Sequence, residues 1–252
     1  MDRDVFAIHS ELESTHWWFA ARRTILRRVV DACGGRAGGT VLDIGCGVGA
    51  TLGAFHPDYR AVGFDPSPDA IEFGRARHPG IDLRVGGIAE AAGFASEADV
   101  VLLNDVIEHV PDDRALLEPL AARLRRGALL IVTVPADMRL WSPHDVALGH
   151  YRRYDLGMLA HATEGLGLRT LFVSPFNARL YPLVRLARWA ARARGESTGH
   201  QGTDLRPTPA PLNAALRSLF AGEAARLEGI AAGRAAPYRH GVSLIGAYRR
   251  EA

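Results

Sequence analysis

Residues 41–65 carry acids and glycines at a spacing that suits a bound nucleoside. Val41-Leu-Asp-Ile-Gly-Cys-Gly-Val-Gly49 is a short apolar run with one acid, followed by three alternating glycines. Because glycine has no Cβ, the backbone there can turn sharply and approach a ligand. Asp65 ends a second apolar run about 20 residues after the loop, where its carboxylate can accept both hydroxyls of a ribose. The pattern predicts a nucleoside-binding half-site.

The glycine spacing and Asp43 indicate which nucleoside is bound. A dinucleotide fingerprint spaces its glycines G-x-G-x-x-G, whereas Gly45, Gly47 and Gly49 follow G-x-G-x-G. The Asp43 carboxylate would repel a pyrophosphate but would attract an ammonium or a sulfonium. The pattern D-x-G-x-G-x-G with an acid at the next strand end resembles class I S-adenosylmethionine (SAM)-dependent methyltransferases. An NAD(P)-dependent oxidoreductase is the alternative enzyme.

This resemblance implies the cofactor contacts of the first half of the chain. The methionine end of the pocket is expected at Asp43, Gly45, Cys46, Gly47 and Gly49, with Cys46 as a small space-filling residue. Asp65 and Pro66 are expected at the ribose, and residues 50–55 are expected to open a helix after the glycine loop. Many relatives place an acid after the third strand to bind the adenine amino group, but this chain has Val85-Gly-Gly-Ile-Ala89. We therefore expect adenine to lie on Ile88 and to bond to backbone.

Polar residues follow the apolar run at 99–103, where ligands of an open α/β sheet bind. Asn104 and Asp105 are expected to face the methionine part of SAM or the acceptor. Glu108 and His109 either orient the next helix or act in the site, with His109 as a reserve base. Asp105-x-x-Glu108-His109 looks like the E-x-x-E-H element with which ubiquinone-pathway O-methyltransferases and small-RNA 3′-end methyltransferases can hold a divalent ion. Because an Asp replaces the first Glu, we expect a metal-free site and keep a hard cation as the alternative.

Residues 135–155 combine histidines, an acid and arginines after the fifth predicted strand. A histidine can remove a proton from a hydroxyl or ammonium near neutral pH, and a neighbouring acid such as Asp145 can fix its tautomer. We expect His144 or His150 to be the catalytic base. The alternative is structural: His144 and Asp145 cap a turn, and Arg152 and Arg153 pair with surface acids.

The segment His16-Trp-Trp-Phe-Ala-Ala-Arg-Arg23 places aromatic rings and cations before the first strand. In similar methyltransferases such a segment covers the cofactor. An indole face attracts a sulfonium and a guanidinium can bind a carboxylate, so Trp18 and Arg22, one helical turn apart, are candidate cofactor contacts. Trp17 and Phe19 are expected to anchor the segment to the sheet.

The tryptophan pair, Leu140-Trp-Ser-Pro-His-Asp145 and His150-Tyr-Arg-Arg-Tyr154 together resemble one bacterial group of class I methyltransferases. Many members occur beside cell-envelope glycan or natural-product genes. The resemblance implies methyl transfer to an oxygen or nitrogen of a small-molecule acceptor. A module that binds SAM without transferring methyl is the alternative from another class. Near-neutral charge and the lack of an Asn-Pro-Pro-Tyr-type motif disfavour nucleic acid.

The order of apolar runs predicts an α/β, Rossmann-like, seven-stranded, doubly wound sheet that is mostly parallel with an antiparallel last strand. We expect one domain: an N-terminal helical lid at 1–35 with its helix at 4–33, a SAM-binding core at 36–174, an insertion over the acceptor at 175–240, and the last strand at 241–252. The predicted strands lie near 41–44, 61–64, 82–85, 99–103, 128–134, 168–173 and 242–248. A helix is expected at about 155–165.

The insertion is expected to hold a helix at 180–194, a mobile loop at 195–211 and a helix at 212–229. The first helix has arginines along one side and apolar residues toward another: Arg185, Arg188, Arg192; Leu183, Leu186, Trp189, Ala190. A basic amphipathic helix can dock on an anionic membrane surface. We favour a lid or dimer helix whose charged side is solvated.

Composition limits the remaining classes. The 252 residues are 48% hydrophobic and 23% charged, which is typical of one globular domain, and the net charge is only +2. All 30 basic residues are arginines, so a lysine base or Schiff base is excluded. The two cysteines indicate neither a disulfide framework nor a zinc site. Without a signal-peptide pattern or an apolar span, a cytoplasmic location is expected, and the oligomeric state is left open.

Overall fold

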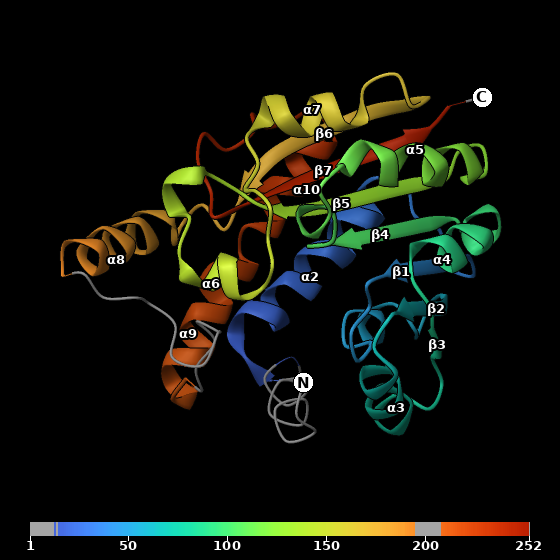
Figure 1. Ribbon diagram of the computed structural model, residues 1–252, viewed down its shortest axis with the longest axis horizontal. Coiled ribbons are helices and arrows are strands. Elements are labelled where there is room, and N and C mark those ends of the chain that lie inside the picture. Colours follow the sequence, from blue (N-terminus) through green and yellow to red (C-terminus); the bar gives the residue numbers. More distant parts are fainter. Residues whose placement is uncertain (1–12, 14, 195–207, 252) are drawn as a thin grey trace.

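One seven-stranded sheet organises the protein in the computed structural model, which describes residues 13, 15–194 and 208–251. The strand order is β3-β2-β1-β4-β5-β7-β6, and β7 runs antiparallel to both of its neighbours (Figure 1). The predicted fold class is therefore confirmed. The strands are β1 Thr40–Ile44, β2 Arg60–Asp65, β3 Asp82–Val85, β4 Val100–Asn104, β5 Leu129–Pro135, β6 Leu168–Phe176 and β7 Ser243–Arg250.

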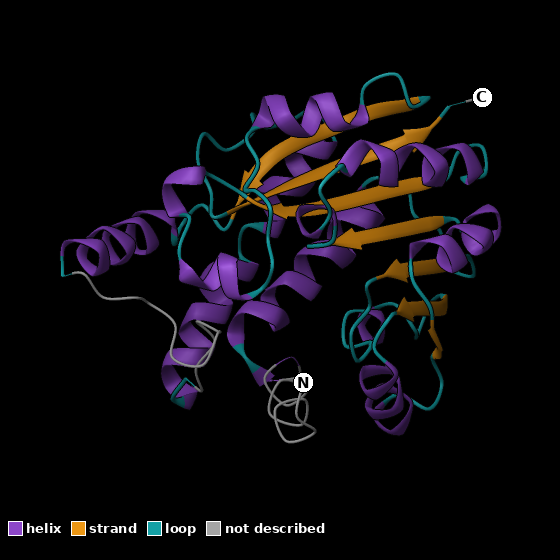
Figure 2. Ribbon diagram, in the orientation of Figure 1, coloured by secondary structure: helices purple, strands orange, loops and turns teal. Residues whose placement is uncertain are grey.

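The central strands are apolar on both faces because helices cover both sides of the sheet (Figure 2). Val41 packs on one side of β1 and Leu42 on the other, and Val100 and Val101 of β4 alternate in the same way. One side carries α2 Trp17–Ala32, α3 Pro68–Arg77 and α10 Ala224–Ala231. The other side carries α4 Ile88–Phe94, α5 Asp113–Arg123 and α7 Leu156–Thr163.

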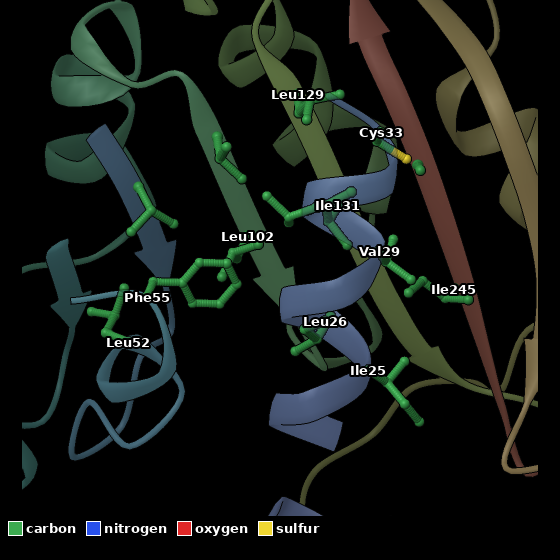
Figure 3. Close-up of a cluster of buried hydrophobic side chains, with 14 of the residues drawn as sticks. Ile25, Leu26, Val29, Cys33, Leu52, Phe55, Leu102, Leu129, Ile131 and Ile245 are labelled. Carbon is green, nitrogen blue, oxygen red and sulfur yellow. The ribbon is translucent and has the colours of Figure 1, made fainter. Parts of the chain in front are cut away.

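Helix α2 fixes the N-terminal segment to the sheet. Its apolar residues recur at helical spacing, and Ile25, Leu26 and Val29 are fully buried. Figure 3 shows these side chains beside Ile131 of β5 and Ile245 of β7. The predicted prelude at 4–33 is confirmed from Trp17 onward, while most of its first part lies outside the described residues. Because α2 is held along its length, its first turn has a defined position at the edge of the sheet.

The connection after the glycine loop differs from the prediction. In place of an α-helix opening at 50–55, the structure has a single 3₁₀ turn, η1 Leu52–Ala54. Only residues 50–59 separate the loop from β2, and Gly53 and Pro57 within them disfavour a longer helix. Stabilisation of a ligand by a helix dipole at this loop is therefore not part of the site.

The insertion also differs. It begins with α8 Tyr181–Ala193, but the single helix predicted at 212–229 is two helices, α9 Ala210–Ala221 and α10. The break lies at Gly222 and Glu223 because the Glu223 side chain is buried and its Oε1 accepts a hydrogen bond from the Arg179 backbone N–H at 2.8 Å. Most of the predicted loop at 195–211 lies outside the described residues. In the described part of the chain, no helix is both long and apolar enough to span a bilayer.

Candidate active site

The glycine bend after β1 has the tight geometry that its sequence predicts. Gly45, Gly47 and Gly49 have φ values of 75°, 56° and 79°, in the left-handed region that favours glycine. The backbone N–H groups of Gly45 and Cys46 both donate to the Phe64 carbonyl, at 2.8 and 3.0 Å. A Cβ on Gly45 would lie 2.8 Å from a Val106 methyl. The bend therefore leaves no room for a side chain at its first position.

Asp43 lies beneath this bend at the wall of a cavity. The carboxylate is buried and accepts a hydrogen bond from the Asn104 amide at 3.2 Å. Burial raises the pKa of Asp43 to about 7, although the nearby Arg22 charge opposes the shift. A cation in the cavity would favour the ionised carboxylate. Cys46 is also buried, and burial raises the pKa of its thiol well above the ordinary value, which is consistent with the predicted space-filling role.

Asp65 connects the end of β2 to the glycine bend. Its Oδ2 accepts from the Gly47 N–H and its Oδ1 from the Ser67 N–H, both at 2.9 Å. Each oxygen keeps a second lone pair, because a carboxylate oxygen can accept two hydrogen bonds. The residue thus has a structural function whether or not it also binds a ribose.

The cavity has a volume of about 750 Å³, within the range of small-molecule sites. It brings together most of the predicted cofactor residues: Trp18, Arg22, Asp43, Gly45, Cys46, Gly47, Asn104 and Asp105. Four predicted cofactor residues are not among the described residues that line the cavity: Gly49, Asp65, Pro66 and Ile88. Ile88 is half-buried against the hydrophobic core and Pro66 is exposed. The cavity therefore covers the expected methionine and acceptor positions, while the adenosine contacts stay predictions.

Arg22 and Trp18 share one face of α2, as their spacing predicts. The guanidinium carbon lies 4.4 Å from the Trp18 ring centre, and the guanidinium forms an ion pair with Asp105. The indole face that could meet a sulfonium is thus covered by Arg22. Within the part of the chain that the structure describes, the buried Arg22 Nε has no hydrogen-bond partner. Arg22 lines the cavity, and a guanidinium there can bind a carboxylate.

Asp105 is held in an unusual backbone conformation at the end of β4. Its φ of 55° is left-handed, which is uncommon outside glycine. Its N–H donates to the Thr133 carbonyl at 2.9 Å, and its Oδ1 accepts from the Thr133 hydroxyl at 3.3 Å. These contacts with β5 aim the carboxylate at Arg22. Backbone strain of this kind concentrates at functional sites.

Glu13 is a cavity residue that the sequence did not reveal. A Cβ on Gly47 would lie 3.3 Å from its Oε1, so the carboxylate lies over the glycine bend. Burial raises the pKa of Glu13 to about 7, with Arg22 opposing and Asp65 adding to the shift. Apart from its position four residues before Trp17, Glu13 belongs to no motif.

At the other end of the cavity, Asp145 organises three groups. Its Oδ1 lies 3.1 Å from His150 Nδ1 and accepts from Arg153 Nε at 2.8 Å, and its Oδ2 accepts from the Ser142 N–H at 2.8 Å. Burial would raise the pKa of Asp145, but the His150 hydrogen bond and the Arg153 charge hold it well below the ordinary value. Asp145 thus caps α6 Pro143–Ala147, as the structural interpretation predicts, and it also contacts His150, as the catalytic interpretation requires.

The expectation for the arginines is wrong for Arg153, which is buried and pairs with a buried acid rather than a surface one. Arg152 pairs with Asp113, as an arginine at the surface would. His144 also lines the cavity, but the carboxylate of Asp145 bonds to His150. His150 therefore has a carboxylate partner that can fix its tautomer.

His109 and Glu108 complete this end. The His109 and His150 rings lie 4.7 Å apart, nearly perpendicular, and burial lowers the pKa of His109, with His150 adding to the shift. Both oxygens of the buried Glu108 carboxylate are without a hydrogen-bond partner among the described residues, and burial raises its pKa. One ligand atom each from Glu108, His109 and His150 lies within 4.8 Å of the others, so this trio could hold a metal ion. The predicted alternative named Asp105 instead of His150, but Asp105 is paired with Arg22.

The insertion forms another wall of the cavity through Val184, Ala187 and Arg188 of α8. The prediction that the charged side of this helix is solvated holds for Arg185 and Arg192, which are exposed, but not for Arg188, which is half-buried. Its apolar side is turned outward, whereas Arg188 lines the cavity and Arg192 donates to the Trp141 carbonyl at 2.6 Å.

The aromatic anchors of α2 also differ from the expectation. Trp17 packs against the hydrophobic core through Phe220 of α9, with ring centres 6.2 Å apart. Its backbone N–H donates to the Asn213 side-chain oxygen at 2.8 Å. It thus anchors α2 to the insertion. Phe19 lines the cavity rather than joining the core.

Comparisons with known proteins agree on one family. A family model described as a methyltransferase domain matches residues 18–172. A Mycolicibacterium smegmatis protein described as a probable S-adenosylmethionine-dependent methyltransferase is 30% identical over 160 residues, 62% of this chain and 61% of its own. A trans-aconitate 2-methyltransferase of Methylobacterium radiotolerans is 34% identical over 102 residues, 38% of each chain. The match thus spans about three fifths of the first relative and less than two fifths of the second. A solved SAM-dependent methyltransferase of Archaeoglobus fulgidus shares the fold with a TM-score of 0.57 at 16% identity, covering 96% of this chain and 99% of its own.

Proposed function

The chain belongs to the methyltransferase domain family, and from this premise we propose that it transfers the methyl group of SAM to an oxygen or nitrogen of a small-molecule acceptor. One observation carries the proposal: His150, which Asp145 contacts from behind, lines the same cavity as Asp43 and the glycine bend. A polarised histidine and a cation-binding carboxylate at one cavity suit removal of an acceptor proton beside a sulfonium.

The residues at the bend fit SAM in charge and shape. Asp43 offers a buried carboxylate to the cationic end, and Gly45 keeps the backbone bare where the ligand passes. Arg22 lines the cavity, and its guanidinium is assigned to the methionyl carboxylate. Asp65 is assigned to the ribose hydroxyls, with Pro66 beside it, and Ile88 to adenine. SAM supplies an electrophilic methyl group when bound, and the remaining task of the protein is to position the acceptor and remove its proton.

We assign the catalytic base to His150. When its Nδ1–H donates to Asp145, its Nε2 is left to accept the proton of a hydroxyl or ammonium. Arg153 binds the same carboxylate and keeps it ionised, so the proton stays on the ring. His109 lies against the His150 ring and helps to place it.

The acceptor is proposed to be a small molecule that enters between α8 and residues 135–155. The trans-aconitate relative acts on a small molecule by its name, which supports this class. We further propose that segment 1–35 covers the cofactor and that the insertion at 175–240 shapes the acceptor side. The net charge of +2 gives no support for a nucleic-acid acceptor.

The test is release of S-adenosylhomocysteine in the presence of a panel of small hydroxylated, carboxylated and amino acceptors. His150→Gln should lower kcat about 10²- to 10⁴-fold, because general base catalysis contributes that much, while SAM still binds. His161→Gln is the matched control, since this histidine is exposed on α7. A chain that binds SAM but transfers no methyl, with no loss in the His150 variant, would instead be a binding module.

A further inference from the structure

Helix α8 presents three large apolar side chains to solvent. Leu183, Leu186 and Trp189 are 63%, 59% and 66% exposed, and they follow one another at three-residue spacing. The helix extends outward from the sheet (Figure 1). Its opposite side is already in use, since Tyr181 and Ala191 are buried there. The outward side thus has no packing partner among the described residues.

The charged residues of α8 and its C-cap are all arginines, and two of them border this apolar strip. Residues 181–194 include four arginines and no acid. Successive residues of a helix project roughly 100° apart, which places Arg185 along one border of the strip and Arg194 along the other. Arg185 is exposed. The surface therefore combines an apolar centre with cationic edges.

We propose that the outward side of α8 docks on a bilayer surface that contains anionic phospholipids. Leu183, Leu186 and Trp189 would enter the boundary between headgroups and acyl chains, where Trp is favoured. Arg185 and Arg194 have apolar stems and charged heads, so they can reach the lipid phosphates from the edges of the strip. The docking does not depend on the proposed methyl transfer.

Two other occupants of the strip fit less well. Segment 195–207, which follows the helix, has the sequence Gly-Glu-Ser-Thr-Gly-His-Gln-Gly-Thr-Asp-Leu-Arg-Pro and offers one large aliphatic residue to cover three large side chains. A second copy pairing through α8 would bring the arginines of both helices together, and like charges repel. An anionic lipid surface satisfies both the apolar centre and the cationic borders.

The full chain should be sedimented with vesicles of phosphatidylcholine alone and of phosphatidylcholine with phosphatidylglycerol. We expect binding to the anionic vesicles and at least about tenfold weaker binding to the neutral ones. The double variant Leu186→Ser/Trp189→Ser should bind anionic vesicles at least about tenfold more weakly, and Arg185→Gln severalfold more weakly. Leu156→Ser/Met158→Ser is the matched control, because these residues are exposed on α7 and should leave binding unchanged.

Trp189 gives a direct readout of depth. Its emission should shift to the blue on anionic vesicles and should be quenched by lipids brominated on the acyl chain, and Trp189→Phe should lose this signal while still binding. Equal SAM affinity and thermal unfolding of wild type and variants would show that the fold is intact. Absent or charge-independent vesicle binding would overturn the proposal. A dimer that Leu186→Ser dissociates, with no vesicle binding, would assign the strip to a second copy.

Discussion

Backbone hydrogen bonds fix the geometry of the cavity at the glycine bend, whereas contacts between side chains fix it around His150. Gly45 and Gly47 owe their positions to hydrogen bonds with Phe64 and Asp65 on the neighbouring strand. His150 owes its position to one carboxylate, Asp145, which also binds an arginine and a helix N-terminus. A change at the bend should therefore alter ligand fit, and a change at Asp145 should alter several contacts together.

The acids at the two ends differ in the same way. Burial raises the pKa of Asp43 and of Glu13 to about 7, because the lost hydration outweighs the opposing charge of Arg22 and Asp65 adds to the shift. Asp145 is also buried, but His150 and Arg153 hold its pKa well below the ordinary value. At the glycine-bend end, a cationic ligand would stabilise the ionised form of the acids. At the histidine end, His150 and Arg153 already stabilise the ionised form of Asp145.

The largest effect is expected from Asp145→Ala, which removes the centre of the histidine end. Arg153 would be left as an unpaired buried charge, so the free energy of unfolding should fall by about 3–5 kcal/mol. The rate of methyl transfer should fall as well. Urea unfolding measures the change in the free energy of unfolding. Asp82→Ala is the control, because its pair with Arg84 is half-exposed and should change stability by less than about 1 kcal/mol. An equal loss of unfolding free energy in both variants would contradict the central role of Asp145 at the histidine end.

The next effect isolates the bend. Gly45→Ala should weaken SAM binding at least about tenfold, because its Cβ would lie 2.8 Å from Val106 and displace the loop. Gly38→Ala is matched in strain, since Gly38 has a φ of 84°, but a Cβ there would meet nothing within 4 Å. Calorimetric titration with SAM should separate the two. Similar SAM affinity in both variants would contradict a role for the Gly45–Val106 contact in SAM binding.

A smaller, pH-dependent effect should appear at Asp43. SAM affinity should rise between about pH 6 and 8 as the carboxyl, with a pKa raised to about 7, ionises. Asp43→Asn should flatten this rise, and Glu13→Gln should flatten it in part because the pKa of Glu13 is also raised to about 7. Affinity that falls with pH would contradict the assignment.

The same raised pKa makes a prediction for the unliganded protein. A carboxyl whose folded pKa exceeds its unfolded value stabilises the fold fully below the unfolded pKa, and this stability is lost as pH rises through the folded value. The free energy of unfolding should therefore decline between about pH 4 and 7. Asp43→Asn should make that slope shallower in urea titrations at several pH values.

The smallest effect is expected from chelation. If His150 acts as a base, EDTA should leave methyl transfer within about twofold of the untreated rate. A loss that Mn²⁺ or Mg²⁺ restores would instead show that Glu108, His109 and His150 hold a metal ion. This outcome would turn the histidine end from a proton-transfer site into a metal centre.

The sequence predicted the fold and the bend because both rest on local patterns. Short apolar runs such as 41–44 and 99–103, separated by helical segments, are typical of buried parallel strands, and alternating glycines after a strand indicate a tight turn. It also predicted that Trp18 and Arg22 share a face, since helical spacing is a local property. The Asp145–His150 contact was open to prediction for the same reason, because five residues separate the two.

What could not be predicted depends on distant contacts. Glu13 lies over Gly47, which is distant from it in the sequence. Asp105 forms an ion pair with Arg22, 83 residues away. The helix predicted at 212–229 is broken by Glu223 bonding to Arg179, a contact between separate parts of the insertion. The position of Arg188 at the cavity was not predicted, because amphipathic spacing identifies two faces of a helix but not which face meets the protein.

Calorimetric titration of SAM into the wild-type protein and into Asp65→Ala tests the central claim most directly. We predict one SAM bound per chain, displaced by S-adenosylhomocysteine and unaffected by NAD⁺, with affinity at least about tenfold lower in the variant. Failure of the wild type to bind SAM, or binding of NAD⁺ in its place, would contradict the assignment of this cavity.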